Sequence, residues 1–344
     1  GMLVIQLFPL KICRDYILKT LKVSLMIRKV IFVISLFSIV FLTHFFISST
    51  YTSNSDTVHQ QGFNSKYNVY SVLKPDNLKF ANENIPESTF DVWERLDKEL
   101  LKNIYWQSNT LLYFKRANKY FPIIEEILEK NNIPSDFKYL ALIESGFEYK
   151  VSPSGAAGFW QIMKGTAREY GLEVNYAIDE RYHLIKSTEA ACKYLQKAYD
   201  KFGSWTMAAA SYNMGINGVQ RQVKKQNTNN YFNLYLNDET SRYVFRIIVI
   251  KEIMENPRKY GFVFRQNDLY SYPSVKQIRV DSTINNLYSF AQENDINYKI
   301  LKRFNPWLRT SKLPDESRRV YYIDIPKKSE ELIFDDLVIE ANKD

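Results

Sequence analysis

Glu144 is the acidic residue whose surroundings best suit acid–base chemistry. It follows the helix-start residues Pro134 and Ser135 and precedes Gly146, a residue type that commonly ends helices in the left-handed conformation. Helical spacing places three apolar residues on its face: Phe137, Leu140 and Ala141. Burial and the negative end of the helix dipole both raise the pKa of such a carboxyl group, which suits a general acid at neutral pH. A helix-end glutamate that faces solvent or pairs with a lysine is the alternative.

A glycine-rich loop follows this helix and favours the chemical interpretation. Residues 152–163 read SPSGAAGFWQIM. Gly155 and Gly158 allow the backbone to approach another group closely. Trp160 offers a flat apolar face, and the amide of Gln161 both donates and accepts hydrogen bonds. Because aromatic faces and amides are typical of sugar-binding sites, this loop predicts a carbohydrate site beside Glu144.

Four short motifs occur in order along the chain. They are Glu144-Ser-Gly-Phe147, Gly158-Phe-Trp-Gln161, Ala210-Ser-Tyr-Asn-Met-Gly215 and Glu239-Thr-Ser-Arg-Tyr-Val244. In this order and spacing they resemble the motifs of the lytic transglycosylases with a goose-lysozyme-like (SLT) fold, and most closely the membrane-bound lytic transglycosylase D branch. The resemblance covers about Pro86 to Phe262, roughly half of the chain. It implies a mainly α protein with a lysozyme-like helical catalytic domain.

The resemblance also implies a reaction and its residues. In this family one carboxylic acid, here Glu144, cleaves the β-1,4 bond between N-acetylmuramic acid and N-acetylglucosamine in peptidoglycan and leaves a 1,6-anhydro end. Tyr243 would line the site and orient Glu144. The other residues implied to hold the substrate are Ser145, Ser152, Ser154, Gly158, Gln161, Met163, Tyr212 and Asn213. We expect no cofactor and no metal.

Two other functions remain open from the sequence. A goose-type lysozyme would hydrolyse the same bond, but it would need a second acid that positions water, for which Asp179 and Glu148 are candidates. Asp179 is better explained as a residue that braces its loop through a salt bridge or caps a helix. A non-catalytic peptidoglycan-binding protein could have kept the same fold.

Helical patterns surround the candidate site. Apolar stripes predict helices around residues 90–101 and 111–117, and a further helix that starts near Pro122. Three more helices are predicted over residues 187–202, 205–213 and 239–255. Asp238 is the expected N-cap of the last one. These helices are most simply the core that holds Glu144 in place.

From Tyr272 onward the pattern predicts a small βααβ unit. Residues 275–280 and 320–325 alternate as strands, and two short helices lie between them, at 283–294 and 298–304. This order resembles a degenerate LysM domain, a class that binds N-acetylglucosamine units, although a small packing domain is the alternative. We therefore expect a transglycosylase domain over residues 88–265, a LysM-like domain over 272–328 and a tail over 329–344.

The first 50 residues predict export. Arg28 and Lys29 precede the apolar run from Val30 to Ile47, the arrangement of a signal peptide or an N-terminal membrane anchor. We expect residues 1–50 to direct the protein to the periplasm or cell envelope. A lipid anchor on Cys13 is disfavoured, because this cysteine precedes the apolar run. Residues 51–87 are polar and predict a linker.

The overall composition is consistent with this interpretation. The 344-residue chain carries a net charge of +8, which favours an anionic partner, and no nucleic-acid motif occurs. We interpret the charge as an aid to binding peptidoglycan, whose peptides carry carboxylates, or as a simple aid to solubility. The two cysteines imply no disulfide framework, and the three histidines, His44, His59 and His183, show no metal-ligand spacing.

Overall fold

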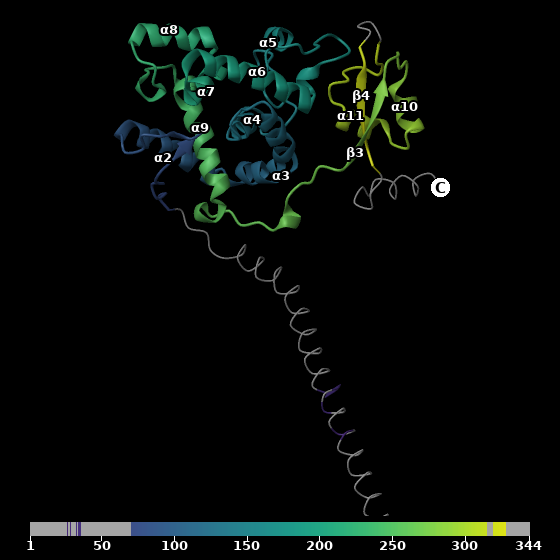
Figure 1. Cartoon of the computed structure of the whole chain (residues 1–344), viewed down its shortest axis with the longest axis horizontal. Coiled ribbons are helices and arrows are strands. Elements are labelled where there is room, and N and C mark those ends of the chain that lie inside the picture. The colour runs from purple at the N-terminus through teal and green to yellow at the C-terminus, as the bar shows by residue number, and fades with distance from the viewer. Residues whose placement is uncertain are drawn as a thin grey trace, which may run out of the picture. The chain divides into compact units, whose positions relative to one another are not determined.

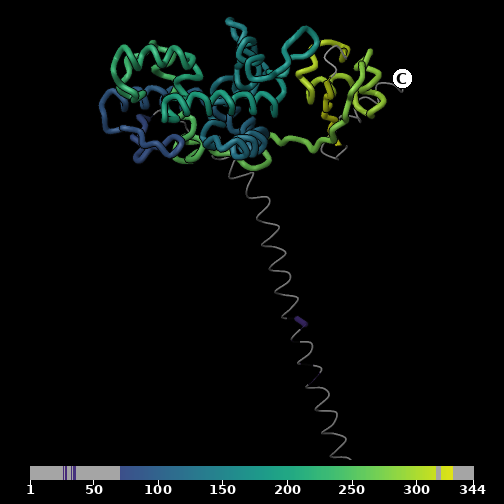
Figure 2. Tube along the Cα trace, turned by 45° about the horizontal axis from the view of Figure 1, so that its top comes forward, coloured from purple at the N-terminus to yellow at the C-terminus, as the bar shows by residue number. Residues whose placement is uncertain are grey.

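A computed structural model describes residues 70–314 and 319–327, together with residues 26, 28, 32, 34 and 35. The chain divides into two units, residues 1–70 and 71–344. The second unit contains the following helices: α2 (Phe90–Tyr105), α3 (Gln107–Lys130), α4 (Phe137–Ser145), α5 (Lys164–Glu169), α6 (Leu184–Phe202), α7 (Trp205–Met214), α8 (Ile216–Gln226), α9 (Asp238–Glu255), α10 (Leu287–Glu293) and α11 (Tyr298–Phe304) (Figure 1). Its strands are β1 (Lys79–Phe80), β2 (Glu83–Asn84), β3 (Val275–Val280) and β4 (Tyr321–Pro326). The predicted mainly α fold is confirmed, and Figure 2 follows the chain from the blue α2 to the yellow C-terminal strands.

The predictions for the two ends of the chain lie almost entirely outside the described residues. This applies to the signal peptide or anchor at residues 1–50, to residues 51–69 of the linker and to the tail at 329–344. Within the part of the chain that the structure describes, no helix combines the length and the apolar character needed to cross a bilayer.

Helix α4 forms the centre of the helical unit because it is apolar on nearly every side. Its fully buried residues are Phe137, Leu140, Ala141 and Leu142. Helices α3 and α9 pack against it (Figure 1). Gly146 ends it in the left-handed conformation, with φ 61°, and donates its N–H to the carbonyl of Leu142 at 2.7 Å. Each fully buried Leu or Phe contributes about 1.5–3 kcal/mol, so the helix that carries Glu144 is firmly anchored.

The predicted helix start at Pro122 is wrong. Helix α3 continues through this proline from Gln107 to Lys130. Proline lacks the N–H that would bond to the carbonyl four residues earlier, but one missing bond does not end a helix whose two halves pack in one core. Buried residues lie on both sides of the proline: Phe114, Ala117, Ile124, Ile127 and Leu128.

The predicted linker ends earlier than residue 87. Strands β1 and β2 form a hairpin, and Phe80 of β1 is fully buried in the helical core. The carboxylate of Glu83 accepts hydrogen bonds from the backbone N–H and the hydroxyl of Thr206, at 3.0 and 2.9 Å, in the first turn of α7. The hairpin therefore belongs to the helical unit and stabilises the start of α7 through the helix dipole.

The predicted N-cap of α9 is off by one residue. Asn237 and not Asp238 is the N-cap, and its side chain accepts a hydrogen bond from the N–H of Thr240 at 2.8 Å.

The C-terminal residues form the predicted βααβ unit. Strands β3 and β4 pair antiparallel, from Val275 opposite Pro326 to Val280 opposite Tyr321, and α10 and α11 lie between them in sequence. Their hydrophobic core also takes in Ala157, Ile178 and Tyr182 from the helical unit. Ala177 and Ile178 thus pack in one core with the βααβ unit and with Ala157 of the loop that follows α4.

Candidate active site

Glu144 lies in the last turn of α4 and meets α9. The hydroxyl of Tyr243 donates a hydrogen bond to Glu144 Oε1, which confirms the expectation that this tyrosine reaches the carboxyl group. Tyr243 is only 2% exposed, so its ring is held by the core. One turn further along α9, Arg246 donates to the carbonyl of Ile143 at 3.1 Å. Helix α9 therefore fixes both the orientation and the electrostatic surroundings of the carboxyl group.

Burial raises the pKa of Glu144 above its ordinary value of 4.5, as predicted, and the nearby charge of Glu239 raises it further. The hydrogen bond from Tyr243 and the positive charge of Arg246 act in the opposite direction. Desolvation is the largest of these effects, because the carboxyl group has exchanged water for protein atoms. Glu144 can therefore hold a proton at a higher pH than an exposed glutamate can.

The glycine-rich loop is folded tightly against the end of α4. Ser145 is buried, and its hydroxyl donates to the carbonyl of Phe159 at 2.9 Å, so it joins the helix to the loop. Gly158 has φ 78°, and an added Cβ would lie 1.9 Å from the carbonyl oxygen of Arg181. Only glycine fits there, because any side chain would collide with the backbone of Arg181. Ser152 also serves the loop, since its hydroxyl accepts from the N–H of Ala156 at 3.0 Å.

Three loop residues are placed where an added molecule could touch them. Ser154 and Met163 are exposed. Gln161 is half-buried and has φ 46°, an unusual backbone conformation for a residue other than glycine. Its amide nitrogen donates to the carbonyls of Gly158 at 2.9 Å and Lys150 at 3.1 Å. A strained backbone persists only where the surrounding structure holds it in place, and such residues are often found at functional sites.

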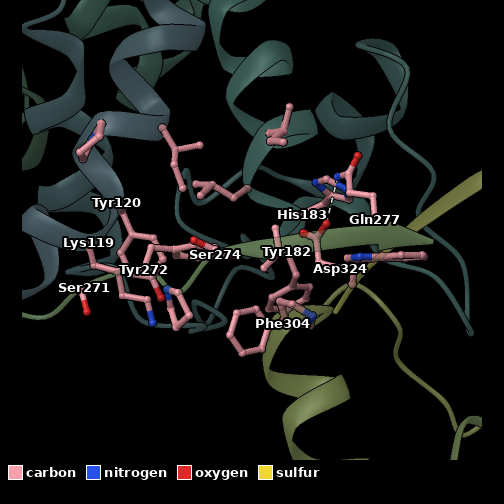
Figure 3. Close-up of a pocket in the computed structure, with 18 of the residues that line it drawn as sticks. Lys119, Tyr120, Tyr182, His183, Ser271, Tyr272, Ser274, Gln277, Phe304 and Asp324 are labelled. Atoms are coloured by element: carbon pink, nitrogen blue, oxygen red, sulfur yellow. Dashed lines mark hydrogen bonds between the residues drawn. The ribbon is translucent and has the colours of Figure 1, made fainter. Parts of the chain in front are cut away.

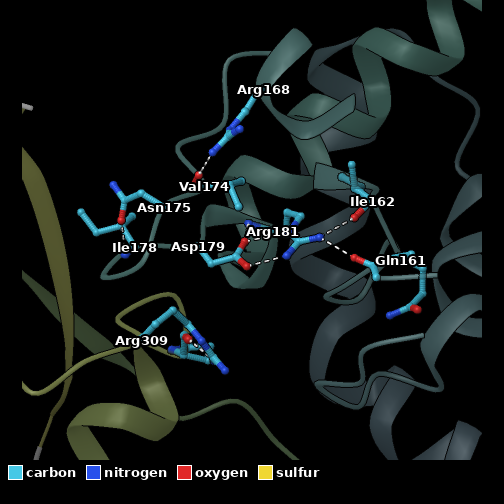
Figure 4. Close-up of polar contacts among 12 residues, drawn as sticks. Gln161, Ile162, Arg168, Val174, Asn175, Ile178, Asp179, Arg181 and Arg309 are labelled. Atoms are coloured by element: carbon cyan, nitrogen blue, oxygen red, sulfur yellow. Dashed lines mark hydrogen bonds and ion pairs between the residues drawn. The ribbon is translucent and has the colours of Figure 1, made fainter. Parts of the chain in front are cut away.

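A buried ion pair braces this loop from the other side (Figure 4). Arg181 pairs with Asp179, with Nη2 to Oδ2 at 2.7 Å and Nε to Oδ1 at 2.9 Å, and each side chain is 10% exposed. Arg181 Nη1 also donates to the carbonyls of Gly155 at 2.8 Å and Ile162 at 3.2 Å. The expected bracing role of Asp179 is confirmed, and Arg181 is a residue that the sequence did not point to.

The βααβ unit is joined to this brace by backbone hydrogen bonds. The N–H of Asp179 donates to the carbonyl of Trp307 at 2.9 Å, and the N–H of Arg309 donates to the carbonyl of Ala177 at 2.8 Å. The guanidinium of Arg309 lies 4.2 Å from the ring centroid of Tyr182, a cation–π contact. Residues from two predicted domains thus support the loop that carries Gln161.

Helix α7 contributes Tyr212 and Asn213. The hydroxyl of Tyr212 donates to the carbonyl of Trp160 at 2.8 Å. Asn213 donates to Glu239 at 3.0 Å and accepts from the hydroxyl of Thr240 at 2.7 Å. The structure therefore brings α7 and the start of α9 together with the Glu144 side of the loop.

Trp160 does not provide the expected flat face for a sugar. Its ring is fully buried, and its Nε1 donates to the hydroxyl of Thr188 at 2.9 Å. The sequence could not distinguish an aromatic platform from an aromatic core residue. Spacing alone also gave no sign that Arg246 and Glu239 act on Glu144, since both depend on how α9 packs against α4.

The two candidate second acids are engaged elsewhere. Asp179 is tied to Arg181, as described above. Glu148 pairs with Arg116 and Lys150, each at 2.5 Å, and its pKa is lowered, chiefly by the hydrogen bond from Lys150. Neither carboxylate shares the surroundings of Glu144.

Comparisons with known proteins match two regions of the chain. Residues 121–235 match the family model "Transglycosylase SLT domain", and residues 276–329 match "Soluble lytic transglycosylase C-terminal LysM-like domain". The chain is 29% identical over 259 residues to "Membrane-bound lytic murein transglycosylase D" of Escherichia coli (strain K12), an alignment that covers 74% of this chain and 54% of that protein.

A second relative is the "Putative tributyltin chloride resistance protein" of Alteromonas sp. (strain M-1), with 31% identity over 125 residues, or 36% of this chain and 60% of that protein. The chain thus spans little more than half the length of the relatives that it matches. Its sequence is therefore similar to a transglycosylase SLT domain and, further along the chain, to a LysM-like C-terminal domain, and it resembles membrane-bound lytic murein transglycosylase D over most of its length.

Proposed function

We propose that this protein is a peptidoglycan lytic transglycosylase in which Glu144 is the single acid and base. The observation that carries the proposal is the state of Glu144. Its carboxyl group is desolvated, its pKa is raised, and Tyr243 holds it beside the loop of the SLT domain. A group that stays protonated at a higher pH than usual suits a general acid.

The proposed reaction cleaves the β-1,4 bond between N-acetylmuramic acid and N-acetylglucosamine. Glu144 donates its proton to the bridging oxygen as the bond from C1 of the muramic acid to that oxygen breaks. The resulting carboxylate then accepts the proton of the muramic acid 6-hydroxyl group, whose oxygen forms a new bond to C1. The product carries a 1,6-anhydro ring, no water is consumed, and Glu144 regains its proton.

The remaining site residues take two proposed roles. Ser154, Gln161 and Met163 would contact the sugars directly, which their exposure and position on the loop support. The others would position the cleft: Ser145, Ser152, Gly158, Tyr212, Asn213 and Tyr243. Their hydrogen bonds to neighbouring groups, and the close approach of Gly158 to Arg181, support this division.

A hydrolytic mechanism is less well supported. It would need a second carboxylate to activate water across the bond. Asp179 and Glu148 are both held in ion pairs. Glu239 is close enough to influence Glu144, but it is exposed and bound by Asn213. A mechanism in which the substrate supplies its own nucleophile requires none of them.

We further propose that the protein acts in the cell envelope. The homology to a protein named as membrane-bound and the matched LysM-like domain support an envelope location and a peptidoglycan partner. We propose separately that residues 1–50 act as a signal peptide or a membrane anchor. The limits 88–265 for the transglycosylase domain and 272–328 for the LysM-like domain are also proposals.

Mass spectrometry of the sugar peptides released from purified peptidoglycan tests the function. We expect products with 1,6-anhydro ends, each lighter by one water molecule than the hydrolysed counterpart. Reducing ends would instead establish a hydrolase. Binding to peptidoglycan without release would establish a non-catalytic role.

A pair of variants tests the assignment of Glu144. Glu144→Gln keeps an oxygen that can accept from Tyr243 but cannot donate the proton, so it should fold and lose nearly all release of product. Glu148→Gln is the matched control, because this glutamate lies four residues away in an ion pair at the surface, and it should keep its activity. Comparable turnover in both variants would remove Glu144 from the mechanism.

A further inference from the structure

A cavity of about 540 Å³ lies away from Glu144, between the helical unit and the LysM-like unit (Figure 3). Its walls come from α3, from residues 182–185, from the connecting residues 271–274 and from the C-terminal βααβ unit. None of the residues assigned to the cleft around Glu144 lines it. Its size falls within the range of sites that hold small ligands.

Six aromatic rings form one part of the cavity wall, called here the aromatic wall. The rings that line it are Tyr120, Tyr149, Tyr182, Tyr272, Phe304 and Trp307. The ring of Tyr272 meets those of Phe304 at 5.9 Å and Tyr120 at 6.1 Å between centroids, both edge to face. This part of the cavity therefore offers apolar surface to a ligand of moderate length and leaves recognition to the few polar groups.

One of those polar groups is the ammonium of Lys119. It lies 5.1 Å from the ring centroid of Tyr120 and 5.4 Å from that of Tyr272. Among the described residues, no carboxylate forms an ion pair with it, while the positive charge of Arg303 is close enough to oppose it. Burial, followed by that repulsion, lowers the pKa of Lys119. An anionic group in the cavity would relieve both effects.

A carboxylate lies in the cavity apart from Lys119. Asp324 of β4 accepts a hydrogen bond from Gln277 of β3 at 2.9 Å, and burial raises its pKa. Within residues 70–314 and 319–327, no lysine or arginine forms an ion pair with it. Figure 3 shows Lys119 and Asp324 on opposite sides of Ser274.

Lys119 and Asp324 are partly buried charges of opposite sign, and neither has an ion-pair partner in the part of the chain that the structure describes. They favour a ligand that carries both complementary charges. Burial of a charge is costly unless the charge is paired. We propose that this cavity binds a short peptide with a carboxylate against Lys119 and an ammonium group against Asp324, its chain lying on the aromatic wall. The peptide stem of peptidoglycan has this chemistry. That identification rests on the proposed function, whereas the need for a doubly charged ligand rests on the cavity alone.

Isothermal titration calorimetry on the full chain tests the proposal without any turnover. The probe is a synthetic stem tetrapeptide with a free side-chain amine, compared with the same peptide acetylated on that amine and with uncharged chitotetraose. We expect the free peptide to bind and the acetylated one to bind about ten to a hundred times more weakly, the worth of one charged hydrogen bond. Absence of peptide binding, equal affinity for the two peptides, or displacement of the peptide by chitotetraose would overturn the proposal.

Variants connect each end of the peptide to its residue. Lys119→Met and Asp324→Asn should each weaken binding of the free peptide about tenfold or more, and Asp324→Asn should no longer distinguish the acetylated form. The controls are Lys130→Met on the same helix, where the lysine is exposed and paired with Glu126, and Asp281→Asn, where the aspartate is exposed beside Arg279. Controls that weaken binding as much would refute the assignment. Because calorimetry needs no catalysis, an inactive enzyme that still binds the peptide would reject only the proposed function.

Discussion

Replacing Arg181 with methionine would remove the guanidinium group at the centre of the loop brace. Methionine keeps most of the aliphatic length but leaves the carboxylate of Asp179 buried and unpaired. The carbonyls of Gly155 and Ile162 would lose their donor as well. Removal of one partner from a buried ion pair typically costs about 3–5 kcal/mol, because the remaining charge is left without compensation. Both side chains are 10% exposed, so solvent can offset little of this cost.

The chain supplies a control with the same sequence separation. Arg279 and Asp281 also form an Arg–Asp pair two residues apart, but their side chains are 57% and 56% exposed. Exposed pairs contribute about 0–1 kcal/mol. We therefore expect Arg279→Met to change the free energy of unfolding by less than about 1 kcal/mol, and Arg181→Met to lower it several times more.

Urea denaturation of both variants measures the difference. The double variant Asp179→Asn/Arg181→Met leaves no unpaired buried charge, so it should regain a substantial part of the stability lost in Arg181→Met. Release of sugar peptides should fall in Arg181→Met, since the brace holds the loop on both sides of Gln161. If Arg181→Met were no less stable than Arg279→Met, the brace would not support the loop as we argue.

Three further predictions concern the site itself. The pKa of Glu144 is raised above 4.5 in the folded protein, so the contribution of this group to stability is full below pH 4.5 and is lost as the pH rises through the folded pKa. Glu144→Gln should therefore be more stable than the wild type at neutral pH. Denaturation below pH 4.5 should show no such difference in stability. Gly158→Ala should lower the free energy of unfolding by about 3 kcal/mol or more, since the added Cβ would meet the carbonyl of Arg181. A Cβ added at Gly155 meets nothing within 4 Å, so Gly155→Ala should lower the free energy of unfolding by only about 1–2 kcal/mol. Equal losses in the two variants would contradict this reasoning. Tyr243→Phe removes a bond that lowers the pKa of Glu144, so the upper limb of the pH–rate profile should move to higher pH while the rate falls, and an unmoved limb would show that the bond does not tune Glu144.

Much of the local structure could be predicted because local sequence decides it. The α4 helix, its end at Gly146 and the βααβ order follow from apolar periodicity and from the conformational preference of glycine. Strand β3 and helix α11 have the predicted bounds, Val275–Val280 and Tyr298–Phe304. The burial of Glu144 also follows from these rules, because its neighbours on the helix face are apolar.

Other features depend on partners that are distant in sequence. Pro122 lies inside α3 because residues on both sides of it pack in one core, which no local signal reveals. The polar sequence around Phe80 and Glu83 predicts a linker, yet each of these two residues has a partner in the helical unit. Trp160 has the same composition signal whether it faces a ligand or the core.

The sequence by itself determined which residue could act as the acid and which elements would carry it, since residue type, helical spacing and turn chemistry are properties of short segments. Only the tertiary structure decided what acts on that acid and what holds its loop. Tyr243 and Arg246 lie about one hundred residues from Glu144 along the chain, and the βααβ unit contacts the segment with Asp179 from more than one hundred residues away. Burial, charge interactions and ion pairs depend on distances in space, and these are established when the helices and the C-terminal unit pack together.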